Sequence, residues 1–282
     1  MPELPEVESV RLKLNQFLVG HKIVRVDVRD RKILEKGEKN LEGGKVEKIR
    51  RFGKVLSIDL DNGYSAVIHI KLTGQLIYRG PNLKDPPELS KKVVGGVPGK
   101  HTHVVFKLDK DAKLFYNDYR KFGWIKVVEK DRVEEIDFIK NLGPEPLDGL
   151  TLKKFKELTS STRRTIKTLL MDQSKIGGVG NIYANDALWL AKINPKTPAN
   201  ELGDQKVKDL YGAVKEVLKK GLELEGASEL AFVMPSGEEG SYQDHTFVYG
   251  REGEKCKRNH DAKIKKFKLS GRGTYLCPVC QE

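Results

Sequence analysis

The chain has 282 residues, 38% hydrophobic and 33% charged, which is enough apolar material for two domains of ordinary size and too much for a disordered chain. Its 52 Lys and Arg against 40 Asp and Glu give a formal net charge of +12. This charge fits a protein that binds a polyanion such as nucleic acid and fits equally well a generally basic protein with no such partner. No apolar run reaches the ~18 residues that cross a bilayer, and the acidic, Pro-rich start is not a secretory signal. Three cysteines, all in the last 27 residues, do not form a disulfide framework. We therefore expect a protein of the reducing cytoplasm with no membrane partner.

The first part of the chain is predicted to contain one helix followed by β-strands. Apolar residues at helical spacing predict a helix over residues 5–18, which Gly20 is placed to end. The stretch 79–102 is rich in Pro, Gly and Lys and predicts a long exposed loop. Alternating apolar and polar residues predict strands over 24–28, 56–60, 66–70, 104–108, 113–116 and 124–128, with an Asp-Asn-Gly hairpin turn at 61–63. Residues 20–128 are therefore expected to form an antiparallel β domain.

A Pro-rich linker at 141–147 is followed by helical periodicity. Helices are predicted over 152–158, 166–170, 182–190 and 204–218, with Thr151 and Asp204 as the caps of the first and the last. Between the second and third lies the Gly-rich turn 177–181, whose glycines would let backbone N–H groups approach a phosphate closely. Taken alone, this turn is more typical of a plain helical hairpin.

The C-terminal segment combines positive charge with residue types that bind metal ions. Residues 255–275 hold eight Lys and Arg against one acid, Asp261. Cys277 and Cys280 have C-x2-C spacing, and three residues separate Cys256 from His260. Four such ligands complete a closed tetrahedral site and leave no position for a catalytic water. We therefore predict one structural Zn2+, with an unmetallated hairpin carrying free thiols as the alternative.

The N-terminus offers a candidate nucleophile. Proline after Met1 favours removal of that methionine, which would expose the secondary amine of Pro2. An α-amine has a pKa of about 7.7–8.0, against about 10.4 for lysine, so a useful fraction is unprotonated at neutral pH and can form a Schiff base. Glu3 is adjacent and could transfer a proton. Many proteins begin in this way, so the signal alone does not identify an active site.

Motifs along essentially the whole chain resemble those of bacterial formamidopyrimidine-DNA glycosylases. The first eight residues, MPELPEVE, are the opening motif of that family. Further motifs follow in the family's order at residues 51–56, 69–74, 100–103, 118–123, 142–146, 178–183, 248–253 and 271–274, before the last two cysteines. One such match would be weak evidence, but this number in the same order is specific.

The resemblance implies an α+β protein of two domains. The expected parts are an N-terminal antiparallel β-sandwich with flanking helices over 1–130, a linker over 131–150, a helix–two-turn–helix DNA-binding domain over 151–244 and a zinc finger over 245–282. The implied activity is that of a base-excision repair enzyme, both DNA glycosylase and abasic-site lyase. It would act as a monomer on damaged double-stranded DNA, through a Schiff base followed by β,δ-elimination.

The resemblance also implies catalytic roles. Pro2 would attack the sugar C1′ of a flipped damaged nucleotide, and Glu3 would donate a proton in the glycosylase step. Lys54 would donate a proton in β-elimination, and Arg272 has the position of the residue assigned to δ-elimination. We interpret Arg272 first as a phosphate clamp, because a guanidinium that is always charged is a poor proton donor. Glu6 is either a supporting carboxylate or an ordinary first-turn residue of the helix.

Six positions correspond to DNA contacts of the family. His69 and Asn181 would bind backbone phosphates, and His101 would also contact DNA. Leu72, Arg120 and Phe122 would fill the space left by the extruded base; leucine replaces the family's usual methionine at 72, with similar volume. Purely structural roles remain the alternative for His69, His101 and Phe122.

Two departures from the family pattern concern the finger and a loop. Asn259 stands where the first finger pair usually has its second cysteine, and His260 follows it. The loop over 227–242, which closes over 8-oxoguanine in the family, is slightly short and carries Ala231 where arginine is common. These features leave the lesion preference open more than the reaction type.

We expect removal of oxidised purines, 8-oxoguanine and formamidopyrimidines. The related endonuclease VIII type, which prefers oxidised pyrimidines, is the first alternative; it usually has glycine where Leu4 stands and lacks the Arg-Lys-Phe-Gly pattern of 120–123. The second alternative is a non-catalytic DNA-binding homologue. The presence of Pro2, Glu3 and Lys54 argues against it.

Overall fold

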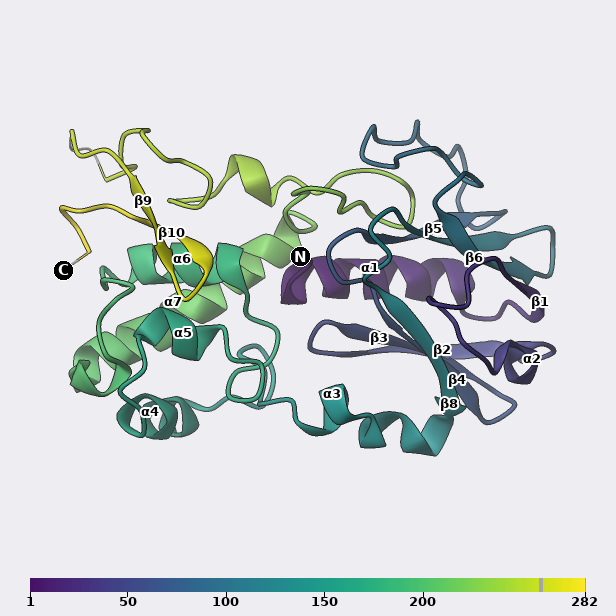
Figure 1. Ribbon diagram of the computed structural model, residues 1–282, viewed down its shortest axis with the longest axis horizontal. Helices are drawn as coiled ribbons and strands as arrows, with labels where there is room; N and C mark the ends of the chain where they lie inside the picture. The colour runs from purple at the N-terminus through teal and green to yellow at the C-terminus, as the bar shows by residue number, and fades with distance from the viewer. Residues whose placement is uncertain (259–260, 282) are drawn as a thin grey trace. The chain divides into compact units, whose positions relative to one another are not determined.

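The computed structural model describes residues 1–258 and 261–281, which form two compact units (Figure 1). Unit 1 consists of Met1–Asn141 and Leu224–Ser241, and unit 2 of Leu142–Glu223 and Tyr242–Glu282. The segment Leu224–Ser241 thus packs within unit 1, although it follows the helices of unit 2 in sequence. Among the described residues, no helix has the length and apolar character needed to span a bilayer.

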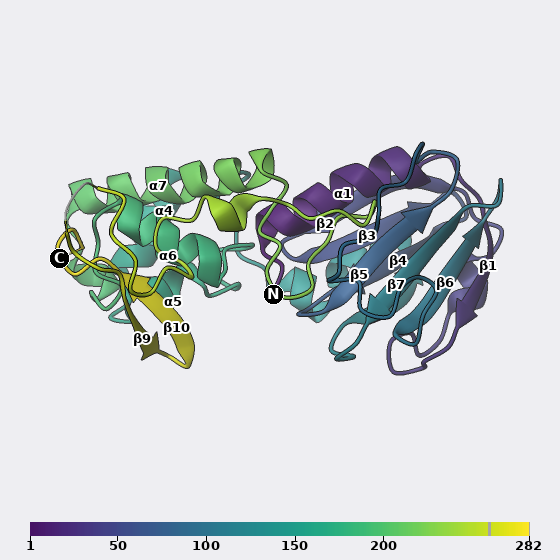
Figure 2. The same cartoon turned by 90° about the horizontal axis from the view of Figure 1, so that it is seen from above.

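Unit 1 is a sandwich of two four-stranded sheets with α1 (Leu4–Leu18) packed alongside (Figure 2). One sheet has the order β1-β6-β7-β5, the other β2-β3-β4-β8, and neighbouring strands are antiparallel. The strands are β1 (Ile23–Val28), β2 (Val46–Phe52), β3 (Val55–Leu60), β4 (Tyr64–His69), β5 (Gly74–Arg79), β6 (Thr102–Leu108), β7 (Lys113–Asp118) and β8 (Trp124–Glu129). Short helices α2 (Glu38–Leu41), η1 (Lys130–Glu135) and α3 (Asp137–Lys140) lie between or after the strands. The predicted antiparallel β-sandwich with a leading helix is confirmed.

One buried core joins α1, both sheets and the returning segment of unit 1. Leu14 of α1, Ile58 of β3 and Phe106 of β6 belong to it and are almost fully buried. Phe232 and Met234 of the returning segment belong to the same core. Burial of these large apolar side chains removes them from water and stabilises the unit. The core therefore fixes the N-terminal helix and the returning segment against the same sheets.

Two strands, β2 and β5, were not predicted. In β2 the pairing with β3 shifts between Val46 and Lys48, and this irregularity breaks the alternation that identifies a strand. In β5 five consecutive residues from Gly74 to Tyr78 are buried, so both faces are covered and no alternation exists. The predicted hairpin of β3 and β4 is present, with Leu56 paired to Ile68.

Unit 2 is built from helices and a C-terminal β-hairpin. Its helices are α4 (Leu152–Ser160), α5 (Ile166–Leu170), α6 (Asn181–Leu190), η2 (Ala199–Glu201), α7 (Asp204–Glu223) and η3 (Tyr242–Asp244). The Thr151 side chain accepts a hydrogen bond from Lys154 N, so the predicted cap of α4 is confirmed. Asp204 is the first residue of α7, not the residue before it, so the predicted cap differs from the observed helix start by one residue.

The hairpin of β9 (Lys265–Leu269) and β10 (Arg272–Leu276) packs against α6. Asn185 Oδ1 of α6 accepts a hydrogen bond of 2.8 Å from Tyr275 N. The fully buried Asp186 accepts backbone N–H groups of residues 247–249 and the hydroxyl of Tyr242. Since four donors satisfy this carboxylate, α6 anchors both the hairpin and the segment that leads to it.

Candidate active site

The N-terminal residues are buried at the start of α1. Glu3 and Glu6 are 3% and 1% exposed. Glu6 Oε2 accepts a hydrogen bond of 2.7 Å from Glu3 N, and Glu6 Oε1 accepts one of 2.7 Å from Ala227 N. Gly226 has a φ of +85°, and a Cβ there would lie 2.8 Å from Glu6 Cγ, so glycine is required. Glu6 therefore links the N-terminus to the returning segment.

Lys54 lies in the tight turn between β2 and β3. Phe52 pairs with Val55, and only Gly53 and Lys54 connect them. Arg51 donates to the Gly53 carbonyl at 3.0 Å, and its Nε donates to Glu8 of α1 at 2.8 Å. These contacts hold the turn against the helix that carries the N-terminus. Lys54 is only 2% exposed, which is unusual for a lysine.

The N-terminal amine shares an electrostatic environment with these side chains. Burial lowers the pKa of the Met1 α-amine below its ordinary value; Glu3 and Glu6 oppose the shift, and Lys54 reinforces it. The structure therefore brings the predicted residues Glu3 and Lys54 into interaction range of the chain's first amine. Removal of Met1 would move the chain's first amine to Pro2, the neighbour of Glu3. An amine, a neighbouring carboxyl group and a second amine are the groups needed for covalent chemistry at carbon with proton transfer.

His69 is buried at the end of β4, in an apolar setting. Its ring meets Trp124 and Phe138 edge-on, and its Nδ1 accepts a hydrogen bond from Lys71 N at 3.1 Å. Burial, reinforced by Lys71 and Lys54, lowers the pKa of His69 to about 3. The imidazole is therefore neutral near pH 7, with its proton on Nε2.

Leu72, Arg120 and Phe122 lie on two turns that are joined at their base. Buried Asp118 accepts hydrogen bonds from the Thr73 hydroxyl and, at 3.2 Å, from Arg120 N. Phe122 is 53% exposed, so it is not part of the core. The Arg120 guanidinium lies 4.8 Å from the centre of the Phe122 ring, an arrangement that holds both exposed side chains together.

The sequence does not predict the roles of three further residues in these turns, Asp118, Tyr119 and Gly123. Asp118 caps the 118–123 turn, since Gly123 N also donates to it at 2.8 Å. A Cβ on Gly123 would lie 1.8 Å from the Tyr116 hydroxyl, so this tight turn requires glycine. Tyr119 is 41% exposed beside Arg120, with its ring edge-on to His101 at 6.2 Å. The sequence feature that could have indicated a role for Tyr119 is an aromatic residue within a charged turn.

The remaining predicted DNA contacts belong to unit 2. Asn181 begins α6 directly after the Gly-rich turn, and Arg272 is exposed at the start of β10. Buried Lys167 of α5 was not predicted: its Nζ donates to Gly273 O at 2.9 Å and to Thr274 Oγ1 at 2.7 Å. It thereby fixes the strand that carries Arg272. The sequence feature that could have indicated Lys167 is a single lysine within the apolar run of α5.

The three cysteines meet at one point of unit 2. Their Sγ atoms lie within 4.8 Å of one another, and those of Cys256 and Cys280 are 3.9 Å apart. Two thiolates on a tetrahedral zinc ion with Zn–S bonds of about 2.3 Å are separated by about 3.8 Å. Cys277 completes the group and is fully buried. The three thiol groups therefore fit one zinc ion, and the predicted fourth ligand, His260, lies outside the described residues.

N–H donors surround this cysteine cluster. Trp189 Nε1 donates to Cys256 Sγ at 3.3 Å, and Arg258 Nη1 donates to Cys280 Sγ at 3.1 Å. The Arg258 guanidinium also lies 3.7 Å from the centre of the Trp189 ring. Donors of this kind stabilise thiolate sulfur and are typical of the surroundings of a metal site.

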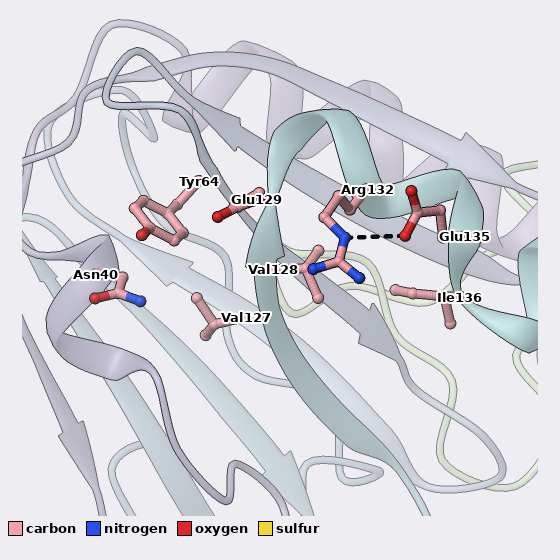
Figure 3. Close-up of a pocket in the computed structure, with 8 residues that line it drawn as sticks. All are labelled: Asn40, Tyr64, Val127, Val128, Glu129, Arg132, Glu135 and Ile136. Atoms are coloured by element: carbon pink, nitrogen blue, oxygen red, sulfur yellow. Dashed lines mark hydrogen bonds and ion pairs between the residues drawn. The ribbon is translucent and has the colours of Figure 1, made fainter.

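A surface pocket of about 430 Å3 lies elsewhere on unit 1 (Figure 3). Its lining comprises Asn40, Tyr64, Val127, Val128, Glu129, Arg132, Glu135 and Ile136, of which Arg132 and Glu135 form an ion pair. Tyr64 and His69 are opposite ends of β4, so at a rise of about 3.3 Å per residue the pocket lies roughly 16 Å from the end that adjoins Lys54. The pocket is therefore separate from the candidate active site.

Comparisons with known proteins give consistent results over the whole chain. Sequence models of the formamidopyrimidine-DNA glycosylase N-terminal domain and H2TH domain match residues 1–125 and 142–232. Proteins named formamidopyrimidine-DNA glycosylase from Pelotomaculum thermopropionicum and Listeria innocua are 40% and 38% identical to the chain; the alignments cover all of this chain and 99% and 100% of the relatives.

Solved structures of a Lactococcus lactis protein, Fpg, are similar to the whole chain. One is a complex with DNA that contains an abasic site, with a TM-score of 0.85, 35% identity and 99% of both chains covered. Another is a complex with DNA that contains an oxidised pyrimidine, also with a TM-score of 0.85 and 35% identity, and it covers 100% of both chains.

Proposed function

Because the chain belongs to the formamidopyrimidine-DNA glycosylase family, we propose that it excises damaged bases from double-stranded DNA and then cleaves the abasic site. The observation that carries this proposal is the burial of Glu3 and Lys54 within interaction range of the N-terminal amine. The family models and the DNA complexes of similar proteins support the substrate class.

The proposed reaction begins at Pro2, once removal of Met1 has converted its nitrogen from an amide to a secondary amine. The nitrogen attacks C1′ of an extruded nucleotide, the bond from C1′ to the base breaks, and Glu3 supplies the proton that the departing base takes up. The Pro2 nitrogen then loses its proton, the C1′–O4′ bond breaks and O4′ takes up a proton, so the sugar ring opens to an iminium on Pro2. In β-elimination water takes a proton from C2′, the bond from C3′ to the phosphate oxygen breaks, and Lys54 donates a proton to the departing 3′-phosphate.

The remaining predicted residues bind the DNA in this proposal. Neutral His69 can donate from Nε2 to a phosphate oxygen, and Asn181 can donate from its side-chain amide. Exposed Arg272 holds a phosphate so that a second, δ-elimination can follow. Leu72 and Phe122 fill the space that the extruded base leaves in the duplex.

Strand cleavage on defined lesions tests this function. Duplexes that carry 8-oxoguanine, a formamidopyrimidine or an oxidised pyrimidine are incubated with the protein under single-turnover conditions. We expect the two purine lesions to be removed faster than the pyrimidine. A preference for the pyrimidine would assign the endonuclease VIII type, and binding without any cleavage would assign a non-catalytic DNA-binding protein.

Arg120 is expected to read the base opposite the lesion. A guanidinium inserted into the duplex can donate to the two acceptors of an unpaired cytosine, N3 and O2, whereas adenine has a C2–H group where cytosine has the O2 acceptor. We predict faster excision of 8-oxoguanine opposite C than opposite A, with a difference of about five- to 100-fold for one discriminating contact. Arg120→Ala should narrow this difference, and equal rates in the unmutated protein would contradict the role.

The cysteine cluster is proposed to hold one structural Zn2+, with Cys256, Cys277, Cys280 and His260 as ligands. The ion would order the finger, whose own apolar core is a small cluster around Val248, Ile264 and Tyr275. Metal analysis should find about one zinc per chain, since one closed four-ligand site holds one ion. His260→Ala should reduce the zinc content, and the matched control His245→Ala should not. A folded, DNA-binding protein without metal would show that packing alone holds the finger.

A further inference from the structure

The segment that returns to unit 1 forms a loop over residues 228–240, most of which is packed down. Phe232 and Met234 enter the core, and Gln75 Nε2 donates to Ala231 O at 2.7 Å. Glu238, Glu239 and Leu230 are exposed, and Leu230 is the only apolar residue among them, 59% exposed with a φ of +52°. A left-handed backbone at a leucine is strained, and such strain persists only where surrounding contacts impose it. The tip of the 228–240 loop is therefore held outward by its base.

Lys92, in the long segment between β5 and β6, closes the base of this loop. Its Nζ donates to Ser228 O at 2.5 Å and forms an ion pair with Glu239. Ser228 and Glu239 stand at opposite ends of the loop, so one ammonium group joins both. Gly240 N donates to Ser228 Oγ at 2.8 Å and also joins the two ends of the loop, which we call its neck. Ser90 adds a hydrogen bond of 2.5 Å to Glu239.

Lys92 is itself fixed by its backbone. Its carbonyl accepts a hydrogen bond of 2.9 Å from Gln75 Nε2, the same atom that holds Ala231 O. Its N–H donates to Ser90 Oγ at 3.1 Å. The lysine side chain is 28% exposed and that of Glu239 37%, so the ion pair is partly shielded from water. A lysine with a fixed backbone and two anchored acceptors can hold the loop in a single position.

The held tip lies near the candidate active site. Ala227, directly before the loop, donates its N–H to Glu6, and Glu6 also accepts from Glu3 N. Glu229 at the tip is close enough to the N-terminal amine for an electrostatic interaction. An exposed apolar side chain at this place suits the flat face of a base that has left the duplex.

We propose that Lys92 is a positioning residue that fixes the neck of the 228–240 loop, so that Leu230 and Glu229 are held where an extruded base approaches the N-terminal amine. This inference rests on the proposed function. Its consequence is selective: steps that need a base in the site depend on Lys92, and steps on a sugar without a base do not.

The test compares Lys92→Met with Lys91→Met, the exposed neighbouring lysine. Single-turnover rates are measured on a duplex with 8-oxoguanine and on one with a preformed abasic site. We expect Lys92→Met to slow base release about tenfold, the scale of a lost charged hydrogen bond, and to change abasic-site cleavage less than about twofold. Lys91→Met should change neither rate, and Lys92→Arg should restore part of the loss. Glu239→Gln should add little to Lys92→Met, since both remove the same ion pair.

A second readout follows the loop without chemistry. Backbone amides of residues 228–240 should exchange hydrogen faster in Lys92→Met than in Lys91→Met, because the neck is opened. Unchanged exchange, faster exchange with unchanged base release, or equal losses on both duplexes would each overturn the proposal. Failure of the proposed function would give a different result, because the unmutated protein would then cleave neither duplex. The hydrogen-exchange comparison would still show whether Lys92 holds the 228–240 loop.

Discussion

Protein that keeps Met1 should form no covalent adduct with abasic or lesion-containing DNA, whereas protein that starts at Pro2 should be trapped by borohydride. With Met1 in place the Pro2 nitrogen is an amide without a basic lone pair, and the free amine is displaced by one residue, about 3.8 Å along the chain. The loss should be at least about a thousandfold, as for removal of an enzyme's nucleophile. The two forms are separated by preparing the protein with and without methionine aminopeptidase and are identified by their masses.

Pro2→Gly is the matched variant for this experiment. Glycine also favours removal of Met1 and supplies a primary amine in the same place, so trapping should be slower than with proline but present. Full trapping by protein that demonstrably retains Met1 would contradict the assignment of the nucleophile.

Glu3→Gln should strongly slow release of the damaged base and spare cleavage at a preformed abasic site. The buried carboxyl group is proposed to supply the proton to the departing base, and a glutamine of equal size cannot donate one in the same way. Loss of such a general acid typically costs about 10²–10⁴-fold in rate. Single-turnover kinetics on an 8-oxoguanine duplex and on an abasic duplex measure the two steps separately.

Glu3 is also the N-cap residue of α1, so the stability of the Glu3→Gln variant needs a control. Thermal unfolding of Glu3→Gln beside the unmutated protein shows whether the fold is intact. Equal losses on both duplexes for Glu3→Gln, with an unchanged melting temperature, would place Glu3 in DNA binding and not in base release.

Local patterns were enough to predict much of the fold. The helical spacing before Gly20 predicts α1, and the Asp-Asn-Gly turn predicts the hairpin of β3 and β4, because both depend on residues close in sequence. The strand β2 was missed because an irregularity at Val46 breaks its alternation. The return of residues 224–241 to unit 1 depends on Phe232 and Met234 reaching a distant core, and no local pattern encodes that.

In the candidate site too, some residues can be predicted from local sequence and others only from the fold or from resemblance to a family. Pro2 and Glu3 follow from the chemistry of an N-terminal amine beside a carboxyl group, but Lys54 in its turn was recognisable only by resemblance to a family. Glu6 reads as an ordinary acid in the first turn of a helix. Its hydrogen bond to Ala227 joins residues 221 apart in sequence, so only the fold reveals it. Lys92 carries no signal at all within a loop of Lys, Pro and Gly.

The most direct test of the proposed chemistry is to locate the covalent bond to DNA. The unmutated protein, freed of Met1, is incubated with an abasic duplex in the presence of borohydride, digested, and analysed by peptide mass spectrometry. The account predicts that the reduced sugar remnant is attached to the nitrogen of Pro2 in the N-terminal peptide. Attachment to Lys54 or to any other lysine would contradict it.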